Sequence, residues 1–86
     1  MAAPSILIVL HDFALGGTER VAVRLAEAWA KQGVAVTIFA GSDAGQLRAL
    51  VGEAVEIVVA EPSIPRGSGS RRRLAQAARA FVEQRR

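Results

Sequence analysis

Three short segments of the chain are apolar at nearly every position, and they limit the possible folds more than any other feature. These segments are residues 5–10, 34–40 and 55–60. A half-exposed strand would alternate apolar and polar residues, whereas a parallel strand that is covered on both faces is apolar throughout. The three runs therefore predict parallel β-strands, and the chain between them must supply the crossover connections.

Segments with helical periodicity separate and follow these runs. Residues 18–32 predict a helix with Thr18 as its N-cap and Gly33 as the residue that ends it. We expect its sheet-facing side to hold Val21, Leu25, Ala28 and Trp29, with Trp29 packed in the core. Residues 46–51 predict a short helix. Residues 71–86 predict a final helix, whose apolar side is Leu74, Ala77, Ala78, Phe81 and Val82.

The alternation of strands and helices predicts an α/β fold, a partial Rossmann-like parallel sheet with strand order 3-2-1 and flanking helices. The length of 86 residues suits one domain. We expect residues 1–86 to form a single incomplete α/β domain, with a Pro/Gly/Ser loop at 61–70 and a basic helix at 71–86. A fourth strand would follow the last helix. Either the chain is a fragment, or something else covers the open side of the first strand.

Composition excludes several classes of protein and of site. A content of 51% hydrophobic and 22% charged residues is typical of an ordered globular chain. The absence of cysteine excludes disulfides and thiolate metal sites, and a single histidine argues against a zinc site. The charge is uneven along the chain. The segment up to Glu61 contains four basic and seven acidic residues. The segment from Pro62 onward contains seven arginines and one glutamate.

The basic C-terminal segment begins its predicted helix with Arg71, Arg72 and Arg73. Cations at a helix start oppose the helix dipole, so this placement is unfavourable unless it serves contact with an anion. A solvated helix end and contact with an anionic membrane both remain open. Nucleic-acid binding has less support, because no aromatic residue is interleaved with the arginines. No apolar run is long enough for a membrane span or a signal peptide, so we expect a cytoplasmic protein, which the basic helix could make peripheral at the inner membrane face.

A glycine pair, Gly16 and Gly17, stands between the first strand and the first helix. A helix N-terminus attracts anions, and glycine allows a phosphate to approach the backbone closely. The pair could therefore cradle a diphosphate, or it could supply a tight turn with positive φ. Neither G-x-x-x-x-G-K-[ST] nor G-x-G-x-x-G is present, which excludes a P-loop and a dinucleotide fingerprint. Without that fingerprint, Asp43 is better explained as a loop residue than as a ribose-binding acid.

The stretch ILIVLHDFALGGTERVAVRLAEAWAKQGVAVTIFAG resembles the opening of a retaining glycosyltransferase of family 4 with the GT-B fold. Members begin with an apolar strand, a loop ending in G-G-x-E, a helix with L-A-x-x-L-x-x-x-G, and a V-x-V strand. The matching residues are Gly16, Gly17, Glu19, Leu25, Ala26 and Gly33. The similarity covers the first half of the chain well.

The resemblance implies an enzyme whose N-terminal domain binds an acceptor, while a C-terminal domain holds a nucleotide-sugar donor. It assigns the donor's diphosphate to Gly16 and Gly17, and it implies no metal and no other cofactor. The acidic residues that bind the donor in this family, and its histidine near the reacting centre, would lie beyond residue 86. His11 and Asp12 could line the acceptor side of the cleft, or simply bond their own turn. Glu19 is better explained as a helix-start residue than as a catalyst.

The sequence therefore predicts the N-terminal, acceptor-side portion of a glycosyltransferase that is hexosyl-transferring or related. We expect the 86-residue chain alone to be inactive, and to be marginally stable or self-associated because of its open edge. Its expected partners are a nucleotide-sugar, a glycan or lipid-linked acceptor, and the missing C-terminal domain. The alternative is a stand-alone α/β binding module without catalytic activity.

Overall fold

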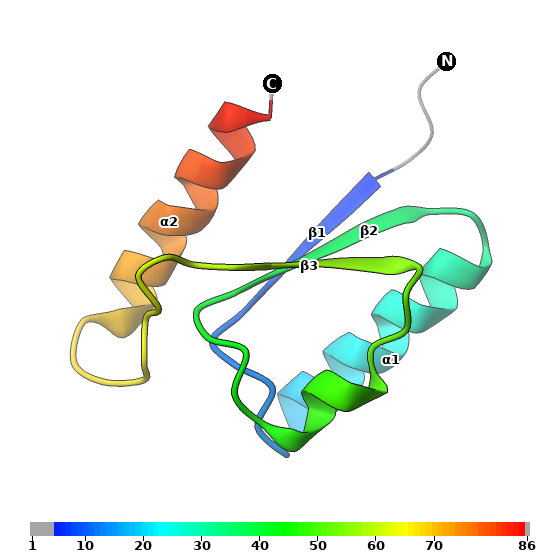
Figure 1. Cartoon of the computed structure of the whole chain (residues 1–86), viewed down its shortest axis with the longest axis horizontal. Helices are drawn as coiled ribbons and strands as arrows, with labels where there is room; N and C mark the ends of the chain where they lie inside the picture. The colour runs from blue at the N-terminus through cyan, green and yellow to red at the C-terminus, as the bar shows by residue number, and fades with distance from the viewer. Residues whose placement is uncertain (1–4, 86) are drawn as a thin grey trace.

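A computed structural model describes residues 5–85, which form a parallel sheet with one long helix on each face (Figure 1). The elements in chain order are β1 (Ser5–Leu10), α1 (Gly17–Lys31), β2 (Ala35–Ala40), the 3-10 helix η1 (Gln46–Leu50), β3 (Val55–Val59) and α2 (Ser70–Gln84). The predicted element order is confirmed. The starts of the elements differ from the predicted ones by one residue at most. The predicted end of the last helix, at residue 86, lies outside the described residues.

The sheet has the strand order β1-β2-β3 and both pairings are parallel. Ile6 of β1 lies opposite Val36 of β2, and Val36 lies opposite Val55 of β3. This arrangement confirms the α/β class, the parallel sheet and the predicted order. Within residues 5–85, β1 pairs with β2 alone, so its other edge carries no strand.

Alternation along β2 divides the interior into two apolar clusters. Val36, Ile38 and Ala40 face α1, together with Leu10, Phe13 and Leu47. Phe39 points to the opposite face and packs under α2. Each face of the sheet thus buries its own helix, which explains why β2 is apolar at consecutive positions.

The sheet-facing side of α1 differs from the predicted one. Val23 and Ala26 are buried, and Ala22, Trp29 and Ala30 pack against the same cluster. Val21 and Leu25 are 57% and 43% exposed, and Ala28 is exposed too, so their expected burial was wrong. Trp29 lies in the core as predicted. Apolar residues occupy two overlapping stripes of this helix. The stripe that packs against the sheet is the one that contains more alanine, and small side chains let a helix pack closely against a sheet.

The start of α1 also differs, because Gly16 is the N-cap and not Thr18. No side chain caps this end, and the first helical hydrogen bond joins the Arg20 N–H to the Gly16 carbonyl (3.0 Å). This start places Glu19 at the third helical position, from which a carboxylate can reach back to the free N–H groups. The predicted end is confirmed: Gly33, at φ +88°, follows the last turn and donates to the Ala30 carbonyl.

Helix α2 covers the other face through Leu74, Ala78, Ala77 and Phe81, as predicted. Val82 is an exception, since it is 38% exposed. The Phe81 ring packs against Phe39 with 5.3 Å between centroids. The helix begins at Ser70, which follows the N-cap Gly69 at φ +74°; the Ser70 side chain is buried and accepts a hydrogen bond from the Gly67 N–H (3.2 Å). None of the helices described over residues 5–85 is long and apolar enough to cross a membrane.

Candidate functional site

The loops that follow the three strands converge at the carboxyl edge of the sheet, where ligands bind in open α/β folds. Gly41 lies at their meeting point. Its N–H donates to the Leu10 carbonyl (3.0 Å), and its carbonyl accepts from the Ile64 N–H (2.8 Å). A Cβ at Gly41 would lie 2.8 Å from the Ile64 carbonyl and 2.9 Å from that of His11. Glycine is needed here because three backbones come together without room for a side chain.

Phe13 anchors the loop after β1, because its side chain is fully buried in the core. The Phe13 N–H donates to the Ala44 carbonyl (2.8 Å), and the Phe13 carbonyl accepts from the Leu47 N–H (2.9 Å). Gly45, at φ +119°, lies against this backbone, and a Cβ there would overlap Phe13. The glycine pair thus follows a loop that is anchored by packing and by main-chain hydrogen bonds.

Neither glycine of the pair adopts a positive φ. Gly16 has φ −126°, and the positive-φ residues of the described chain are Gly33, Gly45 and Gly69. The interpretation of the pair as a positive-φ turn is therefore wrong. A Cβ at Gly16 would overlap the Glu19 carboxylate, whereas a Cβ at Gly17 would meet nothing within 4 Å. The backbone of Gly17 is open to solvent at the N-terminus of α1.

Arg66 joins the loop before α2 to the start of α1. Its Nε donates to Asp12 Oδ2 (2.8 Å), and its Nη2 donates to Asp12 Oδ1 (3.1 Å) and to Glu19 Oε2 (2.8 Å). The hydrogen bond from Arg66 lowers the pKa of Asp12. A hydrogen bond from its own backbone N–H, and then the one from Arg66, lower the pKa of Glu19. Both carboxylates raise the pKa of Arg66. All three groups stay charged near neutral pH.

Asp12 and His11 occupy different environments. Asp12 Oδ1 also accepts from the Ala14 N–H (3.0 Å), so this side chain bonds its own turn as well as Arg66. His11 Nε2 is buried and has no hydrogen-bond partner among residues 5–85. An unpaired buried nitrogen is costly, and a ligand or a solvent molecule would satisfy it.

A cavity of about 360 Å³ opens between the N-termini of α1 and α2, at the end of β1. Two arginines, one histidine, one threonine and one glutamate supply its polar lining, and Val9, Leu10, Leu74 and Ala75 supply the apolar part; the polar residues are His11, Thr18, Glu19, Arg66 and Arg71. Two helix N-termini and two guanidinium groups make this cavity suited to an anion.

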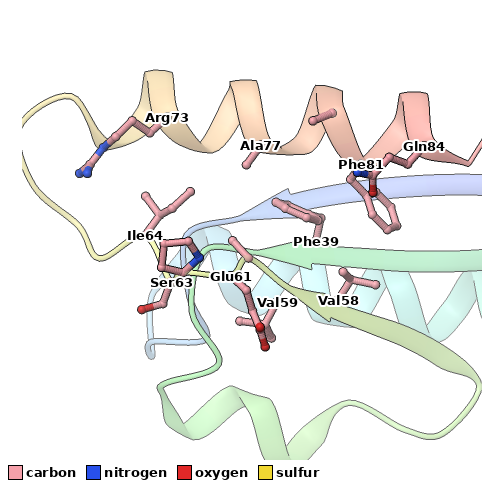
Figure 2. Close-up of a pocket in the computed structure, with 13 residues that line it drawn as sticks. Phe39, Val58, Val59, Glu61, Ser63, Ile64, Arg73, Ala77, Phe81 and Gln84 are labelled. Carbon is pink, nitrogen blue, oxygen red and sulfur yellow. The ribbon is translucent and has the colours of Figure 1, made fainter.

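The three consecutive arginines do not form one patch. Arg71 lines the cavity beside β1, whereas Arg73 lines a groove of about 470 Å³ on the other side of α2 (Figure 2). Figure 2 shows Arg73 above Ile64 at the start of α2, with Phe39 and Phe81 farther along the groove. Successive helical residues point about 100° apart, so the three cations diverge.

Sequence reasoning missed Arg66. It lies 54 positions after Asp12 and 47 positions after Glu19, inside a loop that is rich in proline and glycine, and no local pattern marks it. Asp43 is exposed in the loop after β2. Over residues 5–85, no three His, Asp or Glu side chains are grouped closely enough to hold a metal ion.

A sequence profile of Glycosyltransferase Family 4 matches residues 15–86. The chain belongs to glycosyltransferase family 4. The matched region includes the G-G-x-E motif, both long helices, β2 and β3, while β1 and the loop from His11 to Ala14 precede it. No curated protein and no solved structure matches the chain. Membership assigns glycosyl transfer as the general chemistry, with a sugar donor and an acceptor as substrates.

Proposed function

We propose that this family 4 chain is the acceptor-side, N-terminal part of a glycosyltransferase that uses a nucleotide-sugar donor. Transfer breaks the bond between the anomeric carbon and a donor phosphate oxygen, and forms a bond to an acceptor hydroxyl that loses its proton. The leaving diphosphate gains negative charge as this happens. The family match supports the reaction class, and the two arginines that line the cavity at the carboxyl edge of the sheet, Arg66 and Arg71, support an anionic donor.

In this proposal the diphosphate contacts the backbone at Gly16 and Gly17. The observation that carries it is the open space around Gly17 at the positive end of α1, where the first N–H groups of a helix have no partner within the helix. The Gly16 N–H already donates to the Ala14 carbonyl (2.8 Å), so Gly16 would contribute close approach rather than a donor. Arg71 faces the neighbouring cavity and adds a cation. These groups would offset the charge of the leaving group without a metal or another cofactor.

The acceptor, a glycan or a lipid-linked sugar, is proposed to approach the same edge near His11. The unpaired His11 Nε2 is a hydrogen-bonding group that a hydroxyl could satisfy. Asp12 is proposed to support this loop, since its carboxylate is already engaged by Arg66 and Ala14. Donor-binding acids are expected in a further domain, so we expect the chain to bind donor fragments without catalysing transfer.

Gly17→Val tests the diphosphate site. The folded chain has room for the valine side chain, but that side chain would fill the space that the diphosphate needs. We expect this variant to bind inorganic pyrophosphate and nucleoside diphosphates about tenfold to a hundredfold more weakly, since a hydrogen bond to a charged group contributes about 1.5–3 kcal/mol. Titration calorimetry gives the affinity, and thermal melting should show an unchanged fold.

Gly67→Val is the matched control, because a Cβ at Gly67 also meets nothing within 4 Å and this residue lies in the loop before α2. Its affinity should equal that of the parent chain. Equal binding by Gly17→Val and the parent chain would remove the diphosphate from the glycine pair. Binding of nucleoside diphosphates together with transfer by the longer enzyme would separate the glycosyltransferase from a stand-alone binding module.

A further inference from the structure

The carboxylate of Glu19 lies at the end of α1 that the proposed diphosphate would use. Its Oε1 occupies the space beside Gly16 in which a side chain would otherwise lie. The carboxylate also lies near its own backbone N–H, one of the donors of this helix end, and this contact lowers the pKa of Glu19. The helix dipole favours an anion here, and Glu19 is the anion that the chain itself supplies.

Arg66 holds this carboxylate in place through Nη2 (2.8 Å). The Glu19 side chain is only 15% exposed, whereas the Arg66 side chain is 53% exposed and comes from a loop. The guanidinium can therefore change partners more easily than the elements beneath it can move. Its two hydrogen bonds to Asp12 need not break when the third one does.

The cavity beside these groups has the size and charge for a small anion. Its volume of about 360 Å³ is within the range of about 300–1,000 Å³ that is typical of small-molecule sites. Arg66 and Arg71 line it, as does His11, whose Nε2 is buried and unpaired. Glu19 is the one acidic residue in this lining, and its charge opposes the entry of a second anion.

We propose that Glu19 is an internal competitor for the diphosphate. It occupies the N-terminus of α1 when no ligand is bound, and a diphosphate displaces it and takes over the hydrogen bond from Arg66. The inference rests on the proposed diphosphate site. Glu19 would then weaken the binding of the diphosphate and speed its release. Arg66 would exchange a hydrogen bond to the Glu19 carboxylate for one to the diphosphate.

The test is the affinity of the whole chain for inorganic pyrophosphate, measured by calorimetry and by amide chemical shifts. Glu19→Gln keeps the shape and removes the charge, so we expect about tenfold tighter binding, with shifts at Gly16, Gly17 and Thr18. Arg66→Gln should bind more weakly than the parent chain. Glu53→Gln, which removes the same charge from the exposed loop before β3, should leave the affinity unchanged.

The outcomes separate this inference from the proposed site. Binding by the parent chain that stays equal or weakens in Glu19→Gln overturns the competition and leaves the diphosphate site intact. No binding by the parent chain or by any variant overturns both. A Glu19→Gln variant whose α1 frays would bind more weakly, so tighter binding cannot arise from lost structure.

Discussion

At the scale of single residues, Arg66 decides how the candidate site is arranged. It is 53% exposed, and exposed ion pairs contribute little to stability one at a time. Its guanidinium nevertheless joins two loops by three hydrogen bonds, and it fixes both Asp12 and Glu19. The residue therefore matters more for the positions of two carboxylates than for the stability of the fold.

This network predicts a pH dependence of stability with a definite sign. Arg66 lowers the pKa of Asp12, and the Glu19 backbone N–H together with Arg66 lowers the pKa of Glu19, so the stability contributed by these carboxylates is present above the ordinary carboxyl pKa of about 4 and is lost as the pH falls through their lowered pKa values. We expect Arg66→Gln to lower the melting temperature at about pH 6 and to have a smaller effect at about pH 2, because the stability from the two carboxylates is lost as the pH falls through their lowered pKa values.

Thermal melts of the parent chain and of Arg66→Gln at the two pH values check this prediction. Arg79→Gln is the control, because Arg79 is exposed on α2 and forms no ion pair within residues 5–85, so the effect of its loss should not depend on the protonation of a carboxyl. A melting-temperature difference for Arg66→Gln that is the same at both pH values would contradict the assignment.

At the scale of elements, α2 has three different sides. One packs on the sheet through Leu74 and Ala78, and its flanks carry Arg71 and Arg73 toward two separate hollows. Arg72 and Arg79 are exposed and lie seven residues apart, which places them two turns apart along the outer side. Any contact between this helix and an anionic surface must therefore be made mainly by the outer pair.

We expect the chain to bind vesicles that contain an anionic phospholipid, and to bind pure phosphatidylcholine vesicles much more weakly at low salt. The double variant Arg72→Gln, Arg79→Gln should bind the anionic vesicles at least about tenfold more weakly. Co-sedimentation measures the bound fraction. The variant Arg24→Gln, Arg48→Gln removes the same charge from other elements and should bind as the parent does. Equal binding to both vesicle types would exclude a membrane role for Arg71, Arg72 and Arg73.

At the scale of the whole molecule, the free edge of β1 is the surface most suited to pairing with another strand. Within residues 5–85 this strand pairs with β2 alone, and Val9 on it is 41% exposed. A free strand edge next to exposed apolar side chains favours pairing with another chain. We propose that this edge accepts a further strand, from the rest of a longer protein or from a second copy.

The chain by itself should therefore self-associate at micromolar concentration. Val9→Lys should shift it toward the monomer, because a charged side chain on an edge strand opposes pairing. Val21→Lys is the matched control, since Val21 is 57% exposed on α1 and lies away from this edge. Sedimentation equilibrium gives the mass of each form, and a monomeric parent chain would contradict the expectation.

The sequence by itself determined the element order, the parallel sheet, the end of α1 at Gly33 and the membership of the family. These features depend on local patterns, namely continuous apolar runs, helical periodicity and the G-G-x-E motif. The helix face was less certain, because α1 carries apolar residues on two stripes and only the sheet selects between them. The predicted burial of Val21 and Leu25 is therefore wrong, and so is the predicted cap at Thr18, because Gly16 is the N-cap.

Only the tertiary structure decided what surrounds the glycine pair. Arg66 reaches Asp12 and Glu19 across about fifty residues of chain, and Gly41 brings three loops together by contacts between backbones. Such contacts depend on how the strands are stacked side by side and leave no periodic trace in the sequence. The physical reason is that a parallel sheet gathers its carboxyl ends at one edge, so residues that are distant in the chain become neighbours only after the sheet has formed.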